Sequence, residues 1–117
     1  MGMTVLIVDD HPSFRASARE LLEAEGYEIV GEAENGTTAL RAVNELKPDL
    51  VLLDVQLPDI DGFEVAARLT NGGGGPAVVL VSSRDGSDFG PLVERSGARG
   101  FIPKAELSGA ALLSLLE

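Results

Sequence analysis

The chain has 117 residues, of which 44% are hydrophobic, so it can build one compact core, and we predict a single domain over residues 1–117. Its 19 acidic residues against 9 Lys plus Arg give a net charge of −10, which opposes direct binding to nucleic-acid phosphates. The absence of cysteine excludes disulfides, a thiolate nucleophile and a zinc–thiolate site.

The sequence gives no sign of membrane insertion or export. No apolar stretch approaches the roughly 20 residues of a membrane span. The first residues also lack the basic segment and cleavage site of a signal peptide. We therefore expect a cytoplasmic location with no membrane contact.

Five short apolar segments are predicted to be β-strands. Three of them are nearly continuous apolar runs, which favour strands covered on both faces within a parallel sheet. The predicted strands are Thr4–Val8, Tyr27–Gly31, Leu50–Leu53, Ala77–Val81 and Gly100–Ile102.

Helical patterns separate these strands. The first begins at Pro12, which suits a first helical turn, and Gly26 provides a stop. Asn35 is a candidate N-cap for the second helix, and Pro48 ends it. A third helix is predicted to begin near Asp61.

The second half of the chain gives weaker helical signals. Four glycines at 72–75 follow the third helix, and we interpret them as a surface loop. The fourth helical region, 87–96, contains Gly90 and Pro91, which would break or shorten a helix. A last helix is predicted from about Leu107 to Leu116.

The regular alternation of strand and helix predicts an α/β domain with a doubly wound parallel sheet and right-handed crossovers. In such sheets, ligands bind beyond the carboxyl ends of the strands, near the point where the strand order reverses. The residues that end the strands are therefore the first candidates for a functional site.

Polar side chains follow four of the predicted strands: Asp9 and Asp10, then Asp54, Ser82 and Lys104. Three carboxylates at one edge would repel one another and raise each other's pKa unless a cation were present. Hard oxygen ligands favour Mg²⁺, which often binds phosphate oxygens in its remaining positions. The pattern therefore predicts a magnesium site that receives a phosphoryl group.

Within such a site, Asp54 could attack as a nucleophile and form an aspartyl phosphate. Lys104 would offer a positive charge to the phosphoryl group, and Ser82 a hydroxyl. Each residue alone also has an ordinary explanation, because Asp often caps helices and Ser and Lys are common in loops. Their coincidence at four strand ends favours the functional interpretation.

Four segments resemble the receiver domains of two-component response regulators. VDDHPSFR resembles the acidic pair that enters the first helix, and LLDVQLPDIDGFEVAARL resembles the phosphoacceptor strand and its loop. VLVSSRD and GARGFIPKAEL resemble the Ser/Thr and lysine segments. The resemblance covers nearly the whole chain and implies a flavodoxin-like, CheY-like sheet in the order 2-1-3-4-5, with helices on both faces.

The resemblance also implies the roles of the acidic residues. It places Asp54 at the phosphoacceptor position and makes Asp10 a direct ligand of Mg²⁺. Asp9 would hold a metal-bound water. The backbone carbonyl of Gln56 would provide the remaining protein ligand.

A further set of residues would act on the bound phosphoryl group. Ser82 and Lys104 would contact it, and the movement of Ser82 would let Phe101 turn inward as a conformational switch. Gln56 and Arg84 lie two residues beyond Asp54 and Ser82, at positions that resemble those tuning attack by water and thus phosphate lifetime.

Ala105 follows Lys104 where many receivers have proline, a feature similar to NarL-type regulators, whose DNA-binding output domain we do not find in this chain. Gly90 and Pro91 lie in a region that often contributes to dimers, so we do not assume the usual dimer. His11 is expected to be a solvated residue at a helix start rather than a phosphorelay histidine. The isomer of the Ile102–Pro103 bond stays open.

Three functions are compatible with these residues. The leading hypothesis is a switch that accepts phosphate from a histidine kinase or phosphotransfer protein and has no other enzymatic activity. The second is a receiver-like interaction module that acts without phosphate, although such modules usually lack some of the acids or the lysine. The third is a Mg²⁺-dependent phosphatase, which typically has a second Asp where Gln56 stands.

Overall fold

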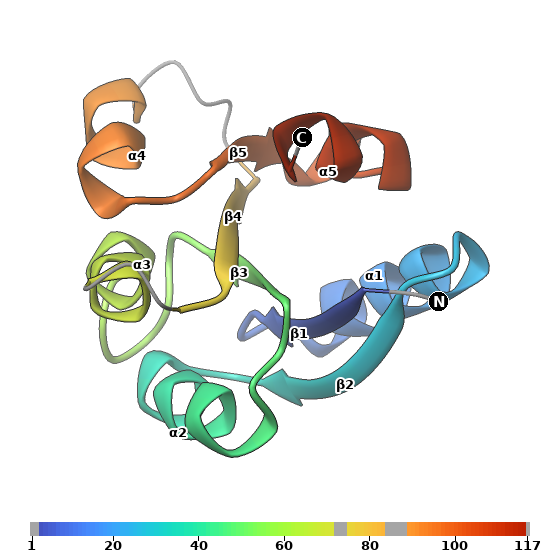
Figure 1. Cartoon of the computed structure of the whole chain (residues 1–117), viewed down its shortest axis with the longest axis horizontal. Helices are drawn as coiled ribbons and strands as arrows, with labels where there is room; N and C mark the ends of the chain where they lie inside the picture. Colours follow the sequence, from blue (N-terminus) through green and yellow to red (C-terminus); the bar gives the residue numbers. More distant parts are fainter. Residues whose placement is uncertain (1–2, 72–74, 84–88, 117) are drawn as a thin grey trace.

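The computed structural model describes residues 3–71, 75–83 and 89–116, which form a parallel sheet between two layers of helices (Figure 1). The strands are β1 (Thr4–Val8), β2 (Glu28–Ala33), β3 (Leu50–Asp54), β4 (Ala77–Ser82) and β5 (Gly100–Pro103). The helices are α1 (Pro12–Ala24), α2 (Gly36–Leu46), α3 (Gly62–Thr70), α4 (Gly90–Ser96) and α5 (Gly109–Leu116), with a short 3₁₀ turn at Lys104–Glu106.

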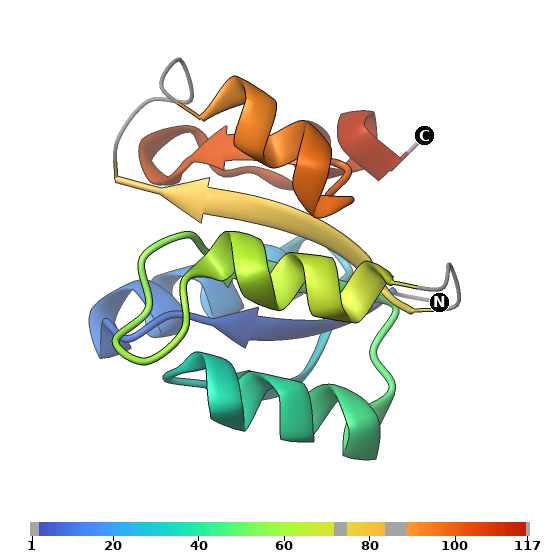
Figure 2. The same ribbon diagram turned by 90° about the vertical axis from the view of Figure 1, so that its left-hand side faces the viewer.

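The five strands lie in the order β2-β1-β3-β4-β5, and all neighbouring strands are parallel. Figure 2 shows the strand arrows pointing the same way, so the carboxyl ends of the strands share one edge of the sheet. The predicted fold class and strand order are therefore confirmed. The strand order reverses between β1 and β3, which is where such sheets bind their ligands.

Alternate residues of each central strand pack into the core on opposite faces of the sheet. In β1, Val5 and Ile7 pack with α1 and α5, whereas Leu6 and Val8 pack with α2 and α3. Figure 1 shows the same division, with α1 and α5 on one side of the sheet and the other three helices opposite. Because both faces are covered, the central strands contain apolar residues at every position, as the sequence predicts.

The helix caps explain where several helices begin. The Asn35 side chain accepts a hydrogen bond of 2.8 Å from Thr38 N, which confirms the predicted N-cap of α2. Asp61 does the same for α3, with Glu64 N as the donor at 2.8 Å. The last helix begins two residues later than predicted, because Ser108 caps its first turn by accepting a hydrogen bond of 3.0 Å from Ala111 N.

The fourth helix is short, as predicted, but Gly90 and Pro91 open it rather than interrupt it. Proline is well suited to this first turn because its missing N–H would have no partner inside the helix. The predicted start of this helical region at 87 and the glycines at 72–74 lie outside the described residues. The Ile102–Pro103 peptide bond is trans, like the other described peptide bonds.

Candidate functional site

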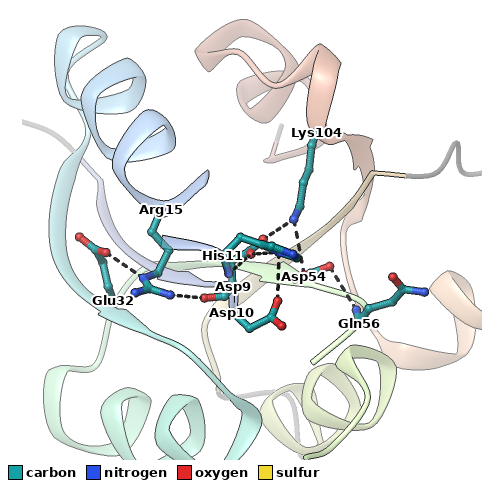
Figure 3. Close-up of polar contacts among 8 residues, drawn as sticks. All are labelled: Asp9, Asp10, His11, Arg15, Glu32, Asp54, Gln56 and Lys104. Carbon is teal, nitrogen blue, oxygen red and sulfur yellow. Dashed lines mark hydrogen bonds and ion pairs between the residues drawn. The ribbon is translucent and has the colours of Figure 1, made fainter. Parts of the chain in front are cut away.

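Three of the predicted site residues meet at the carboxyl edge of the sheet (Figure 3). Lys104 follows β5, and its Nζ lies 2.6 Å from Asp9 Oδ2 and 3.5 Å from Asp54 Oδ2. Asp9 follows β1 and is fully buried, and Asp54 is the last residue of β3 with a side chain only 4% exposed. One ammonium therefore pairs with two buried carboxylates contributed by separate strands.

Asp9 is held on both sides by neighbouring backbone. Its N–H donates to Ala33 O at 3.0 Å, and its Oδ1 accepts a hydrogen bond of 2.8 Å from His11 N. Its Oδ2 is buried and accepts no hydrogen bond from the described residues. The 2.6 Å approach of Lys104 to this atom is thus an ion pair that lacks hydrogen-bond geometry. A buried carboxylate oxygen in this state favours a cation.

Burial raises the pKa of Asp54 to about 6, because the charged carboxylate loses its hydration. The nearby carboxylates of Asp9 and Asp10 raise it further. The hydrogen bond from Gln56 N, 3.1 Å from Asp54 Oδ1, and the charge of Lys104 act in the opposite direction. The repulsion expected from the sequence is therefore present and only partly compensated by Lys104.

The acidic residues fit a divalent metal ion. Side-chain ligand atoms of Asp9, Asp10, His11 and Asp54 all lie within 4.8 Å of one another. The oxygens are the hard ligands that Mg²⁺ prefers, and a bound cation would relieve the repulsion around Asp54. The acidic pocket is therefore compatible with metal binding.

Ser82 and Phe101 lie on the same face of the sheet. Phe101 pairs with Leu80 in the register of β4 and β5, and Ser82 follows Leu80 by two residues. Ser82 is buried at the end of β4. The Phe101 ring lies 5.7 Å from that of Phe89, which in turn lies 5.6 Å from Phe63. Phe101 is thus continuous with an aromatic cluster that reaches α3.

Two predicted residues are not tested by these contacts. The side chain of Gln56 is exposed, and its backbone N–H rather than its carbonyl makes the contact with Asp54. Its predicted metal contact stays a prediction. Arg84 lies outside the described residues.

Sequence reasoning missed three residues around the acidic pair. His11 was expected to be solvated, and its side chain is 66% exposed, yet its Nδ1 lies 3.1 Å from Oδ1 of both Asp9 and Asp10. Arg15 donates from Nη1 to the carbonyl of Asp9 at 2.6 Å and pairs with Glu32 on β2 at 3.1 Å. The position of His11 directly after two acids was the available signal, whereas the Arg15–Glu32 pair needs the fold.

A family model described as the response regulator receiver domain matches residues 5–116. The chain belongs to this family. It is a receiver domain of the two-component response regulators. Its fold and the acidic pocket at the carboxyl edge agree with this assignment.

Individual relatives agree with the family. A protein of Pseudomonas aeruginosa named as a transcriptional regulator is 43% identical over 110 residues, which cover 94% of this receiver domain and 53% of the relative. The transcription regulator BvgA of Bordetella pertussis is 43% identical over 102 residues, covering 87% of this chain and 49% of BvgA. The receiver domain thus spans about half the length of these relatives.

Solved structures of receivers have the same fold. The signal receiver domain of the response regulator NarL from Mycobacterium tuberculosis superposes with a TM-score of 0.85 at 32% identity. The match covers 98% of this chain and 97% of that one. The similarity to NarL-type regulators that Ala105 suggested is thus confirmed. Within the described residues, no helix has the length and apolar character needed to cross a membrane.

Proposed function

We propose that this receiver domain is a phosphorylation-controlled switch in which Asp54 accepts a phosphoryl group from a histidine kinase or phosphotransfer protein. The observation that carries the proposal is the meeting of Asp9, Asp54 and Lys104 at one edge of the sheet. An oxygen of Asp54 would attack the phosphorus of a phosphohistidine while the P–N bond breaks, leaving the phosphate on Asp54 and the imidazole on the donor.

The surrounding residues would position and stabilise this phosphoryl group. Mg²⁺, held by Asp10, Asp54 and the Gln56 carbonyl with Asp9 holding a bound water, would supply charge neutralisation at the phosphoryl oxygens. The ammonium of Lys104 would pair with the phosphate instead of the carboxylates, and the hydroxyl of Ser82 would donate a hydrogen bond to it. The hydrogen bond from Gln56 N already orients Asp54, which would leave its Oδ2 as the attacking atom.

The readout would be a change of surface rather than catalysis on another molecule. Movement of Ser82 toward the phosphate would free space for Phe101, which shares its face of the sheet and contacts Phe89 beside α4. We propose that self-phosphorylation and loss of the phosphate, at a rate set partly by Gln56 and Arg84, are the chemical activities of the domain. Its relatives are transcription regulators about twice as long, which supports a DNA-binding output partner and a cytoplasmic location.

Intact-mass spectrometry after incubation with Mg²⁺ and acetyl phosphate tests the proposal. The wild type is expected to gain one phosphoryl group that decays slowly, while Asp54→Asn gains none. Rapid release of inorganic phosphate without a lasting adduct would instead indicate a phosphatase. Absence of any adduct in the folded wild type would contradict the switch and favour an interaction module that acts without phosphate.

A further inference from the structure

We propose that His11 is an additional metal ligand, and that through its Nδ1 the site binds divalent transition metals such as Zn²⁺ in competition with Mg²⁺. The inference rests on the proposed function, because it uses the same acidic cluster. It adds a nitrogen ligand and a second class of cation to that cluster. The chain contains one histidine, and it lies directly after the two acids.

The distances around His11 match those between ligands of one metal ion. Atoms bound about 2.1 Å from a shared ion lie about 3.0–3.4 Å apart in octahedral or tetrahedral geometry. His11 Nδ1 lies 3.1 Å from Asp9 Oδ1 and 3.1 Å from Asp10 Oδ1. Side-chain ligand atoms of Asp9, Asp10, His11 and Asp54 all lie within 4.8 Å of one another, so a small adjustment brings Asp54 to an ion held by Asp10 and His11.

The backbone holds His11 beside the acids. Pro12 follows His11 and restricts it to an extended conformation, and its observed φ and ψ are −99° and 109°. The N–H of His11 donates to Asp9 Oδ1, which fixes the turn between β1 and α1. Figure 3 shows the ring directed toward Asp9 and Asp10, close to Asp54. The backbone of His11 is thus held locally, and the contacts of Nδ1 with Asp9 and Asp10 orient its exposed ring.

The chemical type of the ligand atoms decides which cations bind more tightly. Carboxylate oxygens suit Mg²⁺, whereas an imidazole nitrogen favours Zn²⁺ and Ni²⁺. Without a metal, the same 3.1 Å contacts allow the ring N–H to donate to the carboxylates. Metal binding instead requires the lone pair of Nδ1 with the proton on Nε2, and this difference makes the two roles separable by experiment.

The test titrates untagged wild type, His11→Gln and His11→Ala with Zn²⁺ and separately with Mg²⁺ by calorimetry. We expect wild type to bind Zn²⁺ more tightly than Mg²⁺, and both variants to lose about tenfold or more in Zn²⁺ affinity with little change for Mg²⁺. Glutamine can donate a hydrogen bond to the acids but offers no imidazole, so a hydrogen-bonding role would survive in His11→Gln. Excess Mg²⁺ should also weaken Zn²⁺ binding.

Long-range ¹H–¹⁵N spectra of the imidazole give a direct readout, because any imidazole signal of the untagged chain comes from His11. Zn²⁺ should shift the Nδ1 resonance far more than that of Nε2. Unchanged Zn²⁺ affinity in both variants, or an equal loss for Zn²⁺ and Mg²⁺, would overturn the inference. Failure of Mg²⁺ to bind wild type would count against the proposed switch, while the role of His11 would still be judged from Zn²⁺.

Discussion

The carboxylate of Asp59 caps the first turn of α2 through Thr37, accepting hydrogen bonds from its N–H at 3.0 Å and its hydroxyl at 2.7 Å. Gly36 N also donates to Asp59 Oδ1, at 2.8 Å. Asp59 lies in the loop that follows Asp54, so these contacts link the loop after β3 to a helix from an earlier part of the chain. Asn35 caps the same helix from within its own segment.

Asp59→Asn is expected to destabilise the protein at neutral pH. It should also reduce the loss of stability that the wild type shows as pH falls into the acid range. Hydrogen bonds from Thr37 and from the backbone of Gly36 and Ile60 hold the pKa of Asp59 far below its usual value. The stability from this carboxylate is therefore present above the unfolded pKa of about 3.8 and is lost as pH falls toward the folded pKa. Thermal melts of both proteins from acid to neutral pH measure the difference.

Glu34→Gln provides the control, since Glu34 is exposed and its side chain makes no hydrogen bond or ion pair with the described residues. It should leave the profile unchanged. If Asp59→Asn and Glu34→Gln gave the same melting temperatures at neutral pH, the capping contacts would contribute nothing measurable.

Asp54→Asn is expected to stabilise the metal-free protein at neutral pH. The pKa of Asp54 is raised to about 6, chiefly by burial, so folding favours the protonated form. The resulting stability is present below about pH 4 and is lost as pH rises through 6. At neutral pH the buried charge should cost on the order of 1–3 kcal/mol. Urea denaturation in EDTA at acidic and neutral pH measures this cost.

Asp49→Asn should have the opposite effect at neutral pH. Hydrogen bonds from the backbone and side chain of Thr4 lower the pKa of Asp49, so its charged form supports the fold. A stabilising effect of both substitutions would point to a general effect of lower net charge rather than to the burial of Asp54.

The sheet and the meeting of Asp9, Asp54 and Lys104 at its edge could be predicted because their signals are local in sequence. A central strand covered on both faces must be apolar throughout, so the first polar residue marks its carboxyl end, as Asp9 and Asp54 do. Parallel pairing then brings these ends together whatever the details of the helices. Lys104 lies at this edge for the same reason, since it directly follows β5.

The contacts between distant segments could not be predicted in this way. The capping of α2 by Asp59 joins residues more than 20 positions apart, and the pairing of Arg15 with Glu32 depends on how α1 packs against β2. Polar residues such as these fit the same sequence pattern whether or not their side chains find a partner. The direction of the His11 side chain was missed for a similar reason, because adjacency to acids does not fix a rotamer.

Lys104→Met is expected to lower the free energy of unfolding by about 2–4 kcal/mol in EDTA, because it leaves the buried carboxylate of Asp9 without its cation. Asp9→Asn in the same background should restore part of that loss. A double-mutant cycle by urea denaturation measures the coupling. Lys47→Met is the control, since Lys47 is exposed and follows α2. Additive effects of the Lys104 and Asp9 substitutions would show that the close ion pair contributes nothing.

Gly97→Ala is expected to destabilise the junction of α3 and α4 by about 1–3 kcal/mol. Gly97 ends α4 with a φ of +81°, and an added Cβ would overlap the hydroxyl of Thr70. That hydroxyl donates to Ser96 O at 2.9 Å and so links the two helices. Gly90→Ala at the other end of α4 is the matched control, because a Cβ there meets no atom within 4 Å.

Gly90→Ala should change stability by less than about 0.5 kcal/mol in urea denaturation. Thr70→Ala combined with Gly97→Ala removes the overlap with the Thr70 hydroxyl, and it leaves the close approach to the Cβ of residue 70 and the backbone strain of a left-handed alanine. If the double variant were as stable as Thr70→Ala alone, overlap with the hydroxyl would account for the whole effect. Equal stability of Gly97→Ala and Gly90→Ala would contradict both contributions.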